Sequence, residues 1–438
     1  MKGPEATGAN RRFLFVDLAE GVRGLHMSSF YLACFVGIML TTFVPQMQPY
    51  LLTEALHVPQ AEHGAISGDL SFWGEFAIVI AVLFWGPLSD KIGRRPVMAA
   101  AFALAALSLI LYPRTDSFTG LLLARLVFAV GIAAYSCMAI TLIADYAREN
   151  SRGKATGLHS LANALGALVT VFLLLRLPAM LQGAGMDSIE AGIGAYNLVC
   201  AVALITMLCM WWGLKPGDRG AREASPGFLT LLREGFAAAR HPPIALSYGA
   251  AFVARGNLAI VGTFMSLWLA NHGTFEMEMT RADAMARAGI VLGVTNLAVL
   301  IAAPLFGILT DRINYITALM IALGFAAVGY GSTWLIDNPL GGAMFLCAAV
   351  IGIGEVGCIV TSGVVIAQES PEHIRGSVIG FFNLCGALGI MFAAKLGGML
   401  FDTWREAAPF IVFAGLAVVV LIWAAVVRSR IPAAGAPA

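Results

Sequence analysis

The chain has 438 residues, of which 59% are hydrophobic and 12% are charged, and its mean hydropathy is +0.82. Because soluble domains carry about 25% charged residues, this composition excludes an ordinary soluble protein and predicts an integral membrane protein. The formal net charge of +1 gives no reason to expect nucleic acid or an acidic macromolecule as a partner.

Apolar runs separated by short polar turns follow one another along the chain. A helix needs about 20 apolar residues to cross the hydrocarbon core of a bilayer. Twelve runs approach or exceed this length, which predicts an all-α membrane protein with twelve transmembrane helices. In chain order they are Ser28–Leu52, Ala65–Leu88, Val97–Tyr112, Phe118–Ala144, Ala155–Leu177, Ala191–Leu214, Pro243–Ala270, Gly289–Leu309, Tyr315–Ile336, Gly341–Ile366, Gly376–Leu400 and Ala407–Val427.

The positive charges predict the orientation of these helices. Most of the 27 Lys and Arg residues fall in turns on the side of the membrane that also holds both termini. Since short loops rich in Lys and Arg stay in the cytoplasm, both termini are predicted to be cytoplasmic. No cleavable signal peptide precedes the first run, which we expect to remain as an anchor. We expect a multi-pass protein of the cell membrane, which in a Gram-negative bacterium is the inner membrane.

The turn-rich stretch between the sixth and seventh runs divides the chain into two bundles of six helices. It holds the amphipathic run FLTLLREGFAAA and reads as a cytoplasmic linker. The predicted organisation is a cytoplasmic segment at 1–27, an N-terminal bundle at 28–214, the linker at 215–242, a C-terminal bundle at 243–428 and a cytoplasmic tail at 429–438.

Two short motifs recur at a distance of about half the chain. GPLSD at Gly86–Asp90 returns as GILTD at Gly307–Asp311, and RGKATG at Arg152–Gly157 returns as RGSVIG at Arg375–Gly380. Equal spacing of two motif pairs indicates that the bundles are parallel repeats, related by an axis along the membrane normal.

The sequence gives no sign of a metal, a cofactor or a catalytic centre. All seven cysteines fall within predicted helices, and the seven histidines are scattered without metal-ligand spacing. No combination of nucleophile, base and oxyanion donors is visible. We therefore expect neither a cofactor nor an enzyme.

The polar turn after the second run resembles the signature of the major facilitator superfamily of secondary transporters. Matching positions are Gly86, Leu88, Ser89, Asp90, Gly93, Arg94 and Arg95, while Lys91 replaces the usual arginine. The resemblance implies a cytoplasmic gate in which Asp145 pairs with the signature arginines and Asp90 meets the start of the eleventh helix at Gly376 and Ser377. Asp311 belongs to the weaker second copy, where Asn314 and Tyr315 replace Gly-Arg. The alternative is a basic turn that only sets orientation.

Five charged residues inside the predicted helices are candidates for the transport site. Each costs about 2.5 to 3.5 kcal/mol at the bilayer centre on insertion scales, so such residues rarely lack a role. Counted at about 1.5 Å per residue from the cytoplasmic ends, Glu75, Arg255 and Glu355 share one depth near the midplane. Asp69 and Arg125 share a level near the external face, where we expect an ion pair. A structural salt bridge between Arg255 and Glu355 is the alternative for the deeper set.

Uncharged polar residues extend this site. Those expected to line a cavity between the bundles are Thr41, Gln46, Asn163, Asn296 and Asn383. Together they favour a modest-sized organic solute with polar and apolar parts over a bare inorganic ion.

These observations predict a secondary transporter that works by alternating access and acts as a monomer in the lipid bilayer. Its expected partners are protons, taken up by Glu75 or Glu355, and a small anionic or amphipathic solute whose anionic group meets Arg255. One alternative is a facilitator without coupling; another is a drug or metabolite exporter, against which the absence of a Gly-Pro-x-x-Gly-Gly motif in the fifth run argues. The alternative of another class is a non-transporting receptor or assembly protein on the same scaffold.

Overall fold

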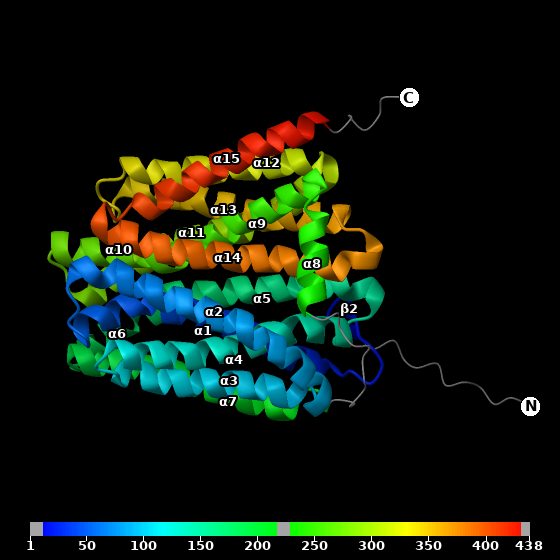
Figure 1. The fold of residues 1–438 in the computed structure, drawn as a ribbon. Coiled ribbons are helices and arrows are strands. Elements are labelled where there is room, and N and C mark those ends of the chain that lie inside the picture. The colour runs from blue at the N-terminus through cyan, green and yellow to red at the C-terminus, as the bar shows by residue number, and fades with distance from the viewer. Residues whose placement is uncertain (1–11, 217–227, 431–438) are drawn as a thin grey trace, which may run out of the picture.

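The computed structural model describes residues 12–216 and 228–430, and almost all of this part is helical. Figure 1 shows long helices running side by side, with β2 and the end of α15 at the same end of the bundle. The main helices are α1 (Gly24–Glu54), α2 (His63–Ile92), α3 (Arg94–Leu111), α4 (Phe118–Tyr146), α5 (Arg152–Phe172), α6 (Leu177–Gly183), α7 (Ser188–Gly213), α8 (Phe228–Ala238), α9 (Pro242–Ala259), α10 (Ser266–Asn271), α11 (Arg281–Arg312), α12 (Tyr315–Ser332), α13 (Gly342–Glu369), α14 (Arg375–Thr403) and α15 (Ala408–Arg430).

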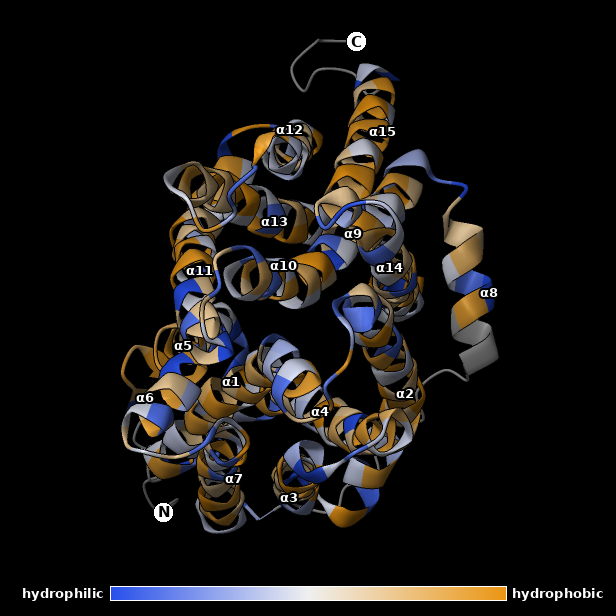
Figure 2. Ribbon diagram, turned by 90° about the vertical axis from the view of Figure 1, so that its left-hand side faces the viewer, coloured by the Kyte–Doolittle hydropathy of each residue, from blue (hydrophilic) through white to orange (hydrophobic). Residues whose placement is uncertain are grey.

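The twelve predicted transmembrane helices are confirmed: in the described residues, twelve helices are long and apolar enough to cross a membrane. Hydrophobic residues predominate along these helices (Figure 2). The seventh span is irregular, because π-helical turns at Ile260–Met265 and His272–Glu276 flank α10. The fifth breaks after Phe172 into a short 3-10 turn and α6.

The clearest difference from the predicted boundaries lies at the start of α11. This helix begins at Arg281 rather than at Gly289, since Thr280 caps it by accepting a hydrogen bond from Asp283 N at 3.1 Å. The Arg281 side chain is 2% exposed because the first turn packs against α1 and α10. A charged residue marks the end of a transmembrane helix only where its side chain reaches water. Arg281 is buried, so the helix extends back to it.

A small hairpin before α1 was not predicted. Strands β1 (Arg12–Phe13) and β2 (Val16–Asp17) pair antiparallel, and the segment continues against the turn between α4 and α5. The Asp17 carboxylate accepts hydrogen bonds from Arg12 and Ser151, and the bond from Arg12 lowers the pKa of Asp17. The predicted segment at 1–27 is thus partly structured; residues 1–11, and residues 217–227 of the linker and 431–438 of the tail, lie outside the described residues.

The two sets of six spans pack through equivalent helices. α2 runs beside α14, and α5 runs beside α11, so the second span of each set meets the fifth span of the other. This exchange is what two parallel repeats facing one another would produce. Helix α8, from the linker, lies across the other helices toward the end of the bundle that holds β2 (Figure 1).

Polar contacts between the two sets gather at one end of the bundle. We call this the distal end; it lies away from Arg12 and Arg430, where α1 ends and α2 begins. In the described chain, every side-chain hydrogen bond or ion pair joining the two sets involves residues 46–71 of the first set. The structure is therefore closed by polar contacts at the distal end.

The arrangement makes the predicted orientation testable with reporter fusions. Alkaline phosphatase, active only outside the cytoplasm, should be inactive after Arg430 at the end of α15 and active after Leu335 between α12 and α13. Green fluorescent protein at the same two positions serves as the matched control and should give the reverse pattern. Phosphatase activity at Arg430 would overturn the orientation.

Candidate functional site

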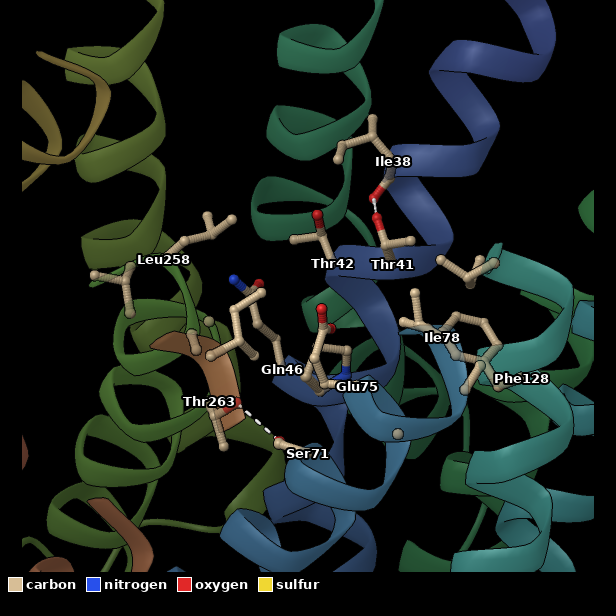
Figure 3. Close-up of a pocket in the computed structure, with 18 of the residues that line it drawn as sticks. Ile38, Thr41, Thr42, Gln46, Ser71, Glu75, Ile78, Phe128, Leu258 and Thr263 are labelled. Atoms are coloured by element: carbon tan, nitrogen blue, oxygen red, sulfur yellow. Dashed lines mark hydrogen bonds between the residues drawn. The ribbon is translucent and has the colours of Figure 1, made fainter. Parts of the chain in front are cut away.

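A central cavity of about 310 Å³ lies between the two sets of helices. Its polar lining comes from both sets, namely Thr41, Thr42, Gln46, Ser71, Glu75, Arg125, Thr263, Thr295, Asn296 and Glu355. In Figure 3, Thr42 and Gln46 from α1, Glu75 from α2 and Leu258 from α9 surround the same space. A volume in this range is that of a pocket for a small organic molecule.

Three of the five predicted cavity residues line this space, and two do not. Thr41, Gln46 and Asn296 are in its wall. Asn163 lies on α5 with its Nδ2 3.4 Å from His159 Nε2, and Asn383 borders a separate cavity. Both residues lie on helices at the interface between the two sets, but their side chains do not line the central cavity.

Hydrogen bonds across the interface close the distal side of the cavity. Ser71 Oγ and Thr263 Oγ1 share one of 3.3 Å, and Ser266 Oγ donates to Gln46 O at 2.8 Å. Sequence reasoning missed Ser71, although it lies four residues before Glu75 and so shares its helix face. Thr263 lies in the π-helical turn, where no regular periodicity could have revealed it.

Glu75 and Glu355 reach the same cavity from opposite sets of helices. Glu75 comes from α2 and Glu355 from α13. Glu355 is 6% exposed, and its Oε2 has no hydrogen-bond partner in the described protein. An unpaired carboxylate oxygen in a buried position favours either a proton on this group or a donor from a bound solute.

Arg125, rather than Arg255, is the arginine in the wall of this cavity. Its guanidinium lies over the Phe128 ring, 5.7 Å from the centroid, and its Nη1 is buried without a partner in the described protein. Gly74 leaves the room for it, since a Cβ there would lie 3.2 Å from Arg125 Nε. The cavity therefore holds two acids and one base, from α2, α13 and α4.

The expected ion pair between Asp69 and Arg125 does not form. Asp69 instead accepts a hydrogen bond from Lys395 on α14, so the pair joins the two sets of helices. Arg125 lies at the level of Gly74, about 7 Å along α2 from Asp69. Residue counting estimates the depth of an α-carbon, but it does not give the direction of a long side chain around or along its helix.

Arg255 is separated from the central cavity. It borders a smaller space of about 110 Å³ together with Ser362 and Asn383, and its stem packs on Gly386, where a Cβ would lie 2.7 Å from Arg255 Cγ. Among the described residues, Arg255 and Glu355 form no salt bridge, and Arg255 is exposed. The structure thus keeps Glu75 and Glu355 in one cavity and places Arg255 in a neighbouring pocket, from which its charge still acts on Glu75.

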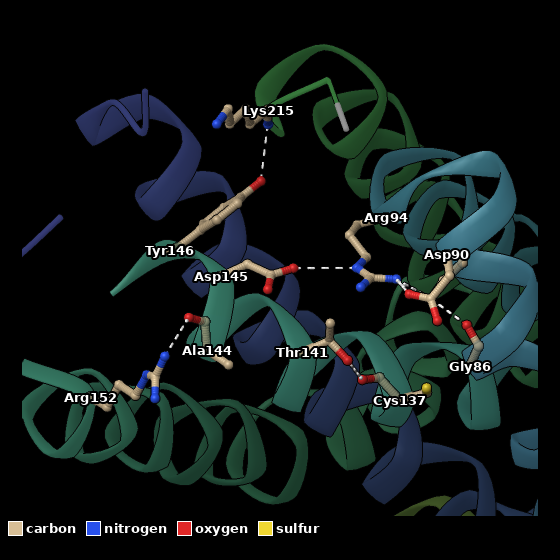
Figure 4. A network of polar contacts seen from close by, with 11 residues as sticks. Gly86, Asp90, Arg94, Cys137, Thr141, Ala144, Asp145, Tyr146, Arg152 and Lys215 are labelled. Atoms are coloured by element: carbon tan, nitrogen blue, oxygen red, sulfur yellow. Dashed lines mark hydrogen bonds and ion pairs between the residues drawn. The ribbon is translucent and has the colours of Figure 1, made fainter. Parts of the chain in front are cut away.

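The signature turn forms a compact ionic cluster around Arg94 (Figure 4). Arg94 Nη1 donates to Asp90 at 2.5 Å and to Ser89 Oγ at 2.6 Å, while its Nε is 3.3 Å from Asp145 Oδ2. This one guanidinium joins the end of α2 to the end of α4. Gly93 has φ of +96°, a left-handed conformation suited to glycine, and it separates α2 from α3.

Other members of the predicted gate have separate positions. Arg95 lies over the Trp211 ring, 5.2 Å from its centroid, which holds α3 against α7. Gly86 lies beside Cys137, and Asp311 is exposed near the end of α11.

The expected contact of Asp90 with Gly376 and Ser377 is not formed in this structure. Ser377 Oγ instead donates to Glu234 Oε2 of the linker helix α8 at 2.6 Å. The sets of helices are joined by polar contacts only at the distal end within 12–216 and 228–430, so the opposite end has no bond of this kind between Asp90 and α14.

The family model of the Major Facilitator Superfamily matches residues 30–394 and, a second time, residues 248–438. The chain belongs to this superfamily. Its solved structural neighbours include the nucleoside transporter NupG, with a TM-score of 0.72 at 15% identity over 92% of this chain and 99% of NupG. This likeness supports the fold, and the predicted twelve-helix architecture of the superfamily is confirmed.

Two similar curated proteins are magnetosome proteins. Magnetosome protein MamZ of Magnetospirillum gryphiswaldense is 28% identical over 411 residues, which cover 90% of this chain and 61% of MamZ. Magnetosome protein MamH of Paramagnetospirillum magneticum is 24% identical over 412 residues, covering 91% of each chain. The chain thus spans less than two thirds of MamZ but most of MamH.

The Arg94 cluster predicts a selective loss of transport when it is broken. Asp90→Asn and Arg94→Ala should each lower the initial rate of solute flux about tenfold, equivalent to one charge-assisted hydrogen bond of about 1.5 kcal/mol. Membrane levels should stay near the wild-type level. Lys91→Ala is the matched control, because it removes a neighbouring charge outside the cluster. Normal flux in both cluster variants would leave only the alternative of a turn that sets orientation.

Proposed function

We propose that the protein is a secondary transporter that moves a small organic solute by alternating access and couples this movement to protons. The observation that carries the proposal is that Glu75 and Glu355, one from each set of helices, line a single cavity between the two sets. A group at this interface meets a different environment when the sets rock against one another. Two carboxylates there provide sites at which a proton and a solute can compete.

The closed distal end suits one state of such a cycle. With both termini in the cytoplasm, the distal end faces the outside, and the structure corresponds to an inward-facing state. The exposed side chains of Arg255 and Asn383 then lie on the route between the cavity and the cytoplasm. The Arg94 cluster belongs to the opposite end, where the two sets must meet when the protein closes toward the cytoplasm.

The residues that line the central cavity indicate what kind of solute to expect. A cavity of about 310 Å³ admits a molecule of modest size, and its hydroxyl and amide groups suit a polar solute. Because Arg125 lines this cavity and Arg255 does not, we expect the anionic group of a bound solute to contact Arg125. Because MamZ and MamH are named for magnetosomes and not for a solute, similarity to them identifies no substrate.

The alternatives differ in their behaviour in proteoliposomes. A facilitator would give flux that an imposed pH gradient does not drive uphill. An exporter would accumulate solute when its orientation in the vesicles is reversed. A receptor or assembly protein would bind without flux. A thermal-shift screen of the purified protein against a metabolite library supplies the solute for these assays.

Coupling through the carboxylates predicts different effects for the two glutamine variants. One of Glu75→Gln and Glu355→Gln should abolish pH-driven accumulation and leave solute exchange intact, because a fixed neutral amide cannot carry a proton. The measurement is uptake of the labelled solute with and without an inward pH gradient. Gradient-driven accumulation in both variants, or pH-independent flux in the wild type, would contradict proton coupling.

The two arginines predict which pocket holds the solute. Arg125→Gln should weaken binding of an anionic solute at least about tenfold, since a hydrogen bond to a charged group contributes about 1.5 to 3 kcal/mol. Arg255→Gln should change the release rate more than the affinity. Isothermal titration and single-turnover efflux separate these effects. If both variants lost the same affinity for the solute, Arg255 would have to be counted as part of the binding site.

A further inference from the structure

The distal closure contains a buried histidine that bridges the two sets of helices. His63 begins α2 and is 0% exposed. Its Nδ1 lies 3.1 Å from Asn271 Oδ1 on α10, and its Nε2 lies 3.0 Å from the carbonyl oxygen of Val58. The first contact joins the two sets, and the second holds the turn between α1 and α2.

The hydrogen-bond partners of His63 determine which of its ring nitrogens are protonated. A backbone carbonyl only accepts, so Nε2 must donate to Val58. Asn271 Oδ1 also accepts from Arg281 Nη2 at 2.9 Å, and turning the amide over would place its NH2 group against the guanidinium. Nδ1 must then donate as well. Only the imidazolium form, with both nitrogens protonated, makes both hydrogen bonds.

Charged groups lie on several of the elements that meet at this closure. Complete burial and the Arg281 guanidinium of α11 oppose a charge on His63. Arg281 directs its Nε and Nη2 to Pro49 O, and both donate hydrogen bonds to this carbonyl. Acidic groups also lie at this closure: Glu54 and Glu406 act on Arg281, Glu62 acts on Asp402, and Glu276 acts on Glu406.

We propose that His63 is a proton-binding residue of the conformational cycle, and that its protonation stabilises the closed distal end. In the closed state both nitrogens face fixed acceptors of the protein, whereas separation of the two sets removes Asn271 and leaves Nδ1 to water. A proton is thus held more strongly when this end is closed, and the same difference makes the proton favour closure. The proposal rests on the proposed function only in assuming that the distal end opens.

Two other groups at the closure must be separated from His63 in any test. Asp402 caps α2 from the other set by accepting from Gly64 N at 2.8 Å and Ala65 N at 2.6 Å. Glu406 lies in the turn before α15, where burial raises the pKa of its carboxyl to about 7. Glu406 therefore also changes charge near neutral pH, and Glu406→Gln is a necessary comparison.

Hydrogen exchange read by mass spectrometry tests the proposal without a known substrate. Labelling times are scaled to the intrinsic exchange rate at each pH, and peptides covering 51–68 and 270–284 are followed from pH 6 to pH 8. Exchange should rise with pH by about tenfold, equivalent to one charge-assisted hydrogen bond of about 1.5 kcal/mol. His63→Gln should give high exchange at every pH. His57→Asn is the matched control, because His57 is exposed on the same turn and its φ of +49° suits asparagine.

A second measurement detects the protonation state of His63 directly. Because it is made on the wild-type protein, it holds even if the variant misfolds. Solid-state NMR of protein in liposomes, labelled with ¹⁵N-histidine, should show an imidazolium signal at pH 6 that is absent in His63→Gln. Asn271→Asp should keep this signal to higher pH, because a carboxylate favours the cation. A neutral His63 at pH 6, or pH-dependent exchange that Glu406→Gln abolishes and His63→Gln does not, would overturn the proposal.

The outcomes also separate this proposal from the proposed function. If no solute crosses the membrane but His63 still titrates together with distal opening, the transporter function fails and the proton site stands. If flux is proton-driven and His63→Gln leaves both flux and exchange unchanged, the proton site alone fails.

Discussion

The absence of water in the hydrocarbon core is the constraint on which this structure depends. A polar group in a membrane helix must find its partner within the protein or in an enclosed polar space. Glu75, Glu355 and Arg125 meet this requirement by facing the cavity between the two sets of helices. Asp69 and Lys395 meet it by pairing across the interface. Charges that are costly in lipid are thereby concentrated at the interface between the two sets, which is the surface that would move in the proposed alternating-access cycle.

Close approach of the helix backbones makes these polar contacts at the distal end. A Cβ at Gly68 would lie 2.3 Å from Ala394 O, and one at Gly398 would lie 2.4 Å from Gly64 O. Because no side chain separates the backbones here, α2 and α14 pack closely enough for Asp402 to cap the start of α2. Small residues bring the two sets together, and polar side chains then bond across the gap.

The sequence was sufficient to predict the features that depend on hydropathy and on local spacing. The twelve spans follow from the length of the apolar runs, and the pairing of Asp145 with a signature arginine follows from the resemblance of the turn after the second run. The meeting of Glu75 with Glu355 followed from depth together with the repeat. The partner of Asp69, the separation of Arg255 from the cavity and the burial of Arg281 did not follow, because each depends on the direction of a side chain around its helix axis and on a neighbour from the other set.

In the proposed transport cycle, the distal network would make closure at that end reversible. Most of its contacts are single hydrogen bonds, such as Ser71 with Thr263 and Ser266 with Gln46 O, and each contributes about 1 kcal/mol. Buried groups such as Arg281 and His63 regain hydration when the sets separate, which offsets part of the loss. A closure built from large apolar side chains would lack this compensation and would hold one state too firmly. Polar contacts therefore allow the two states to lie within a few kcal/mol of each other, a difference that binding of a solute or a proton is large enough to reverse.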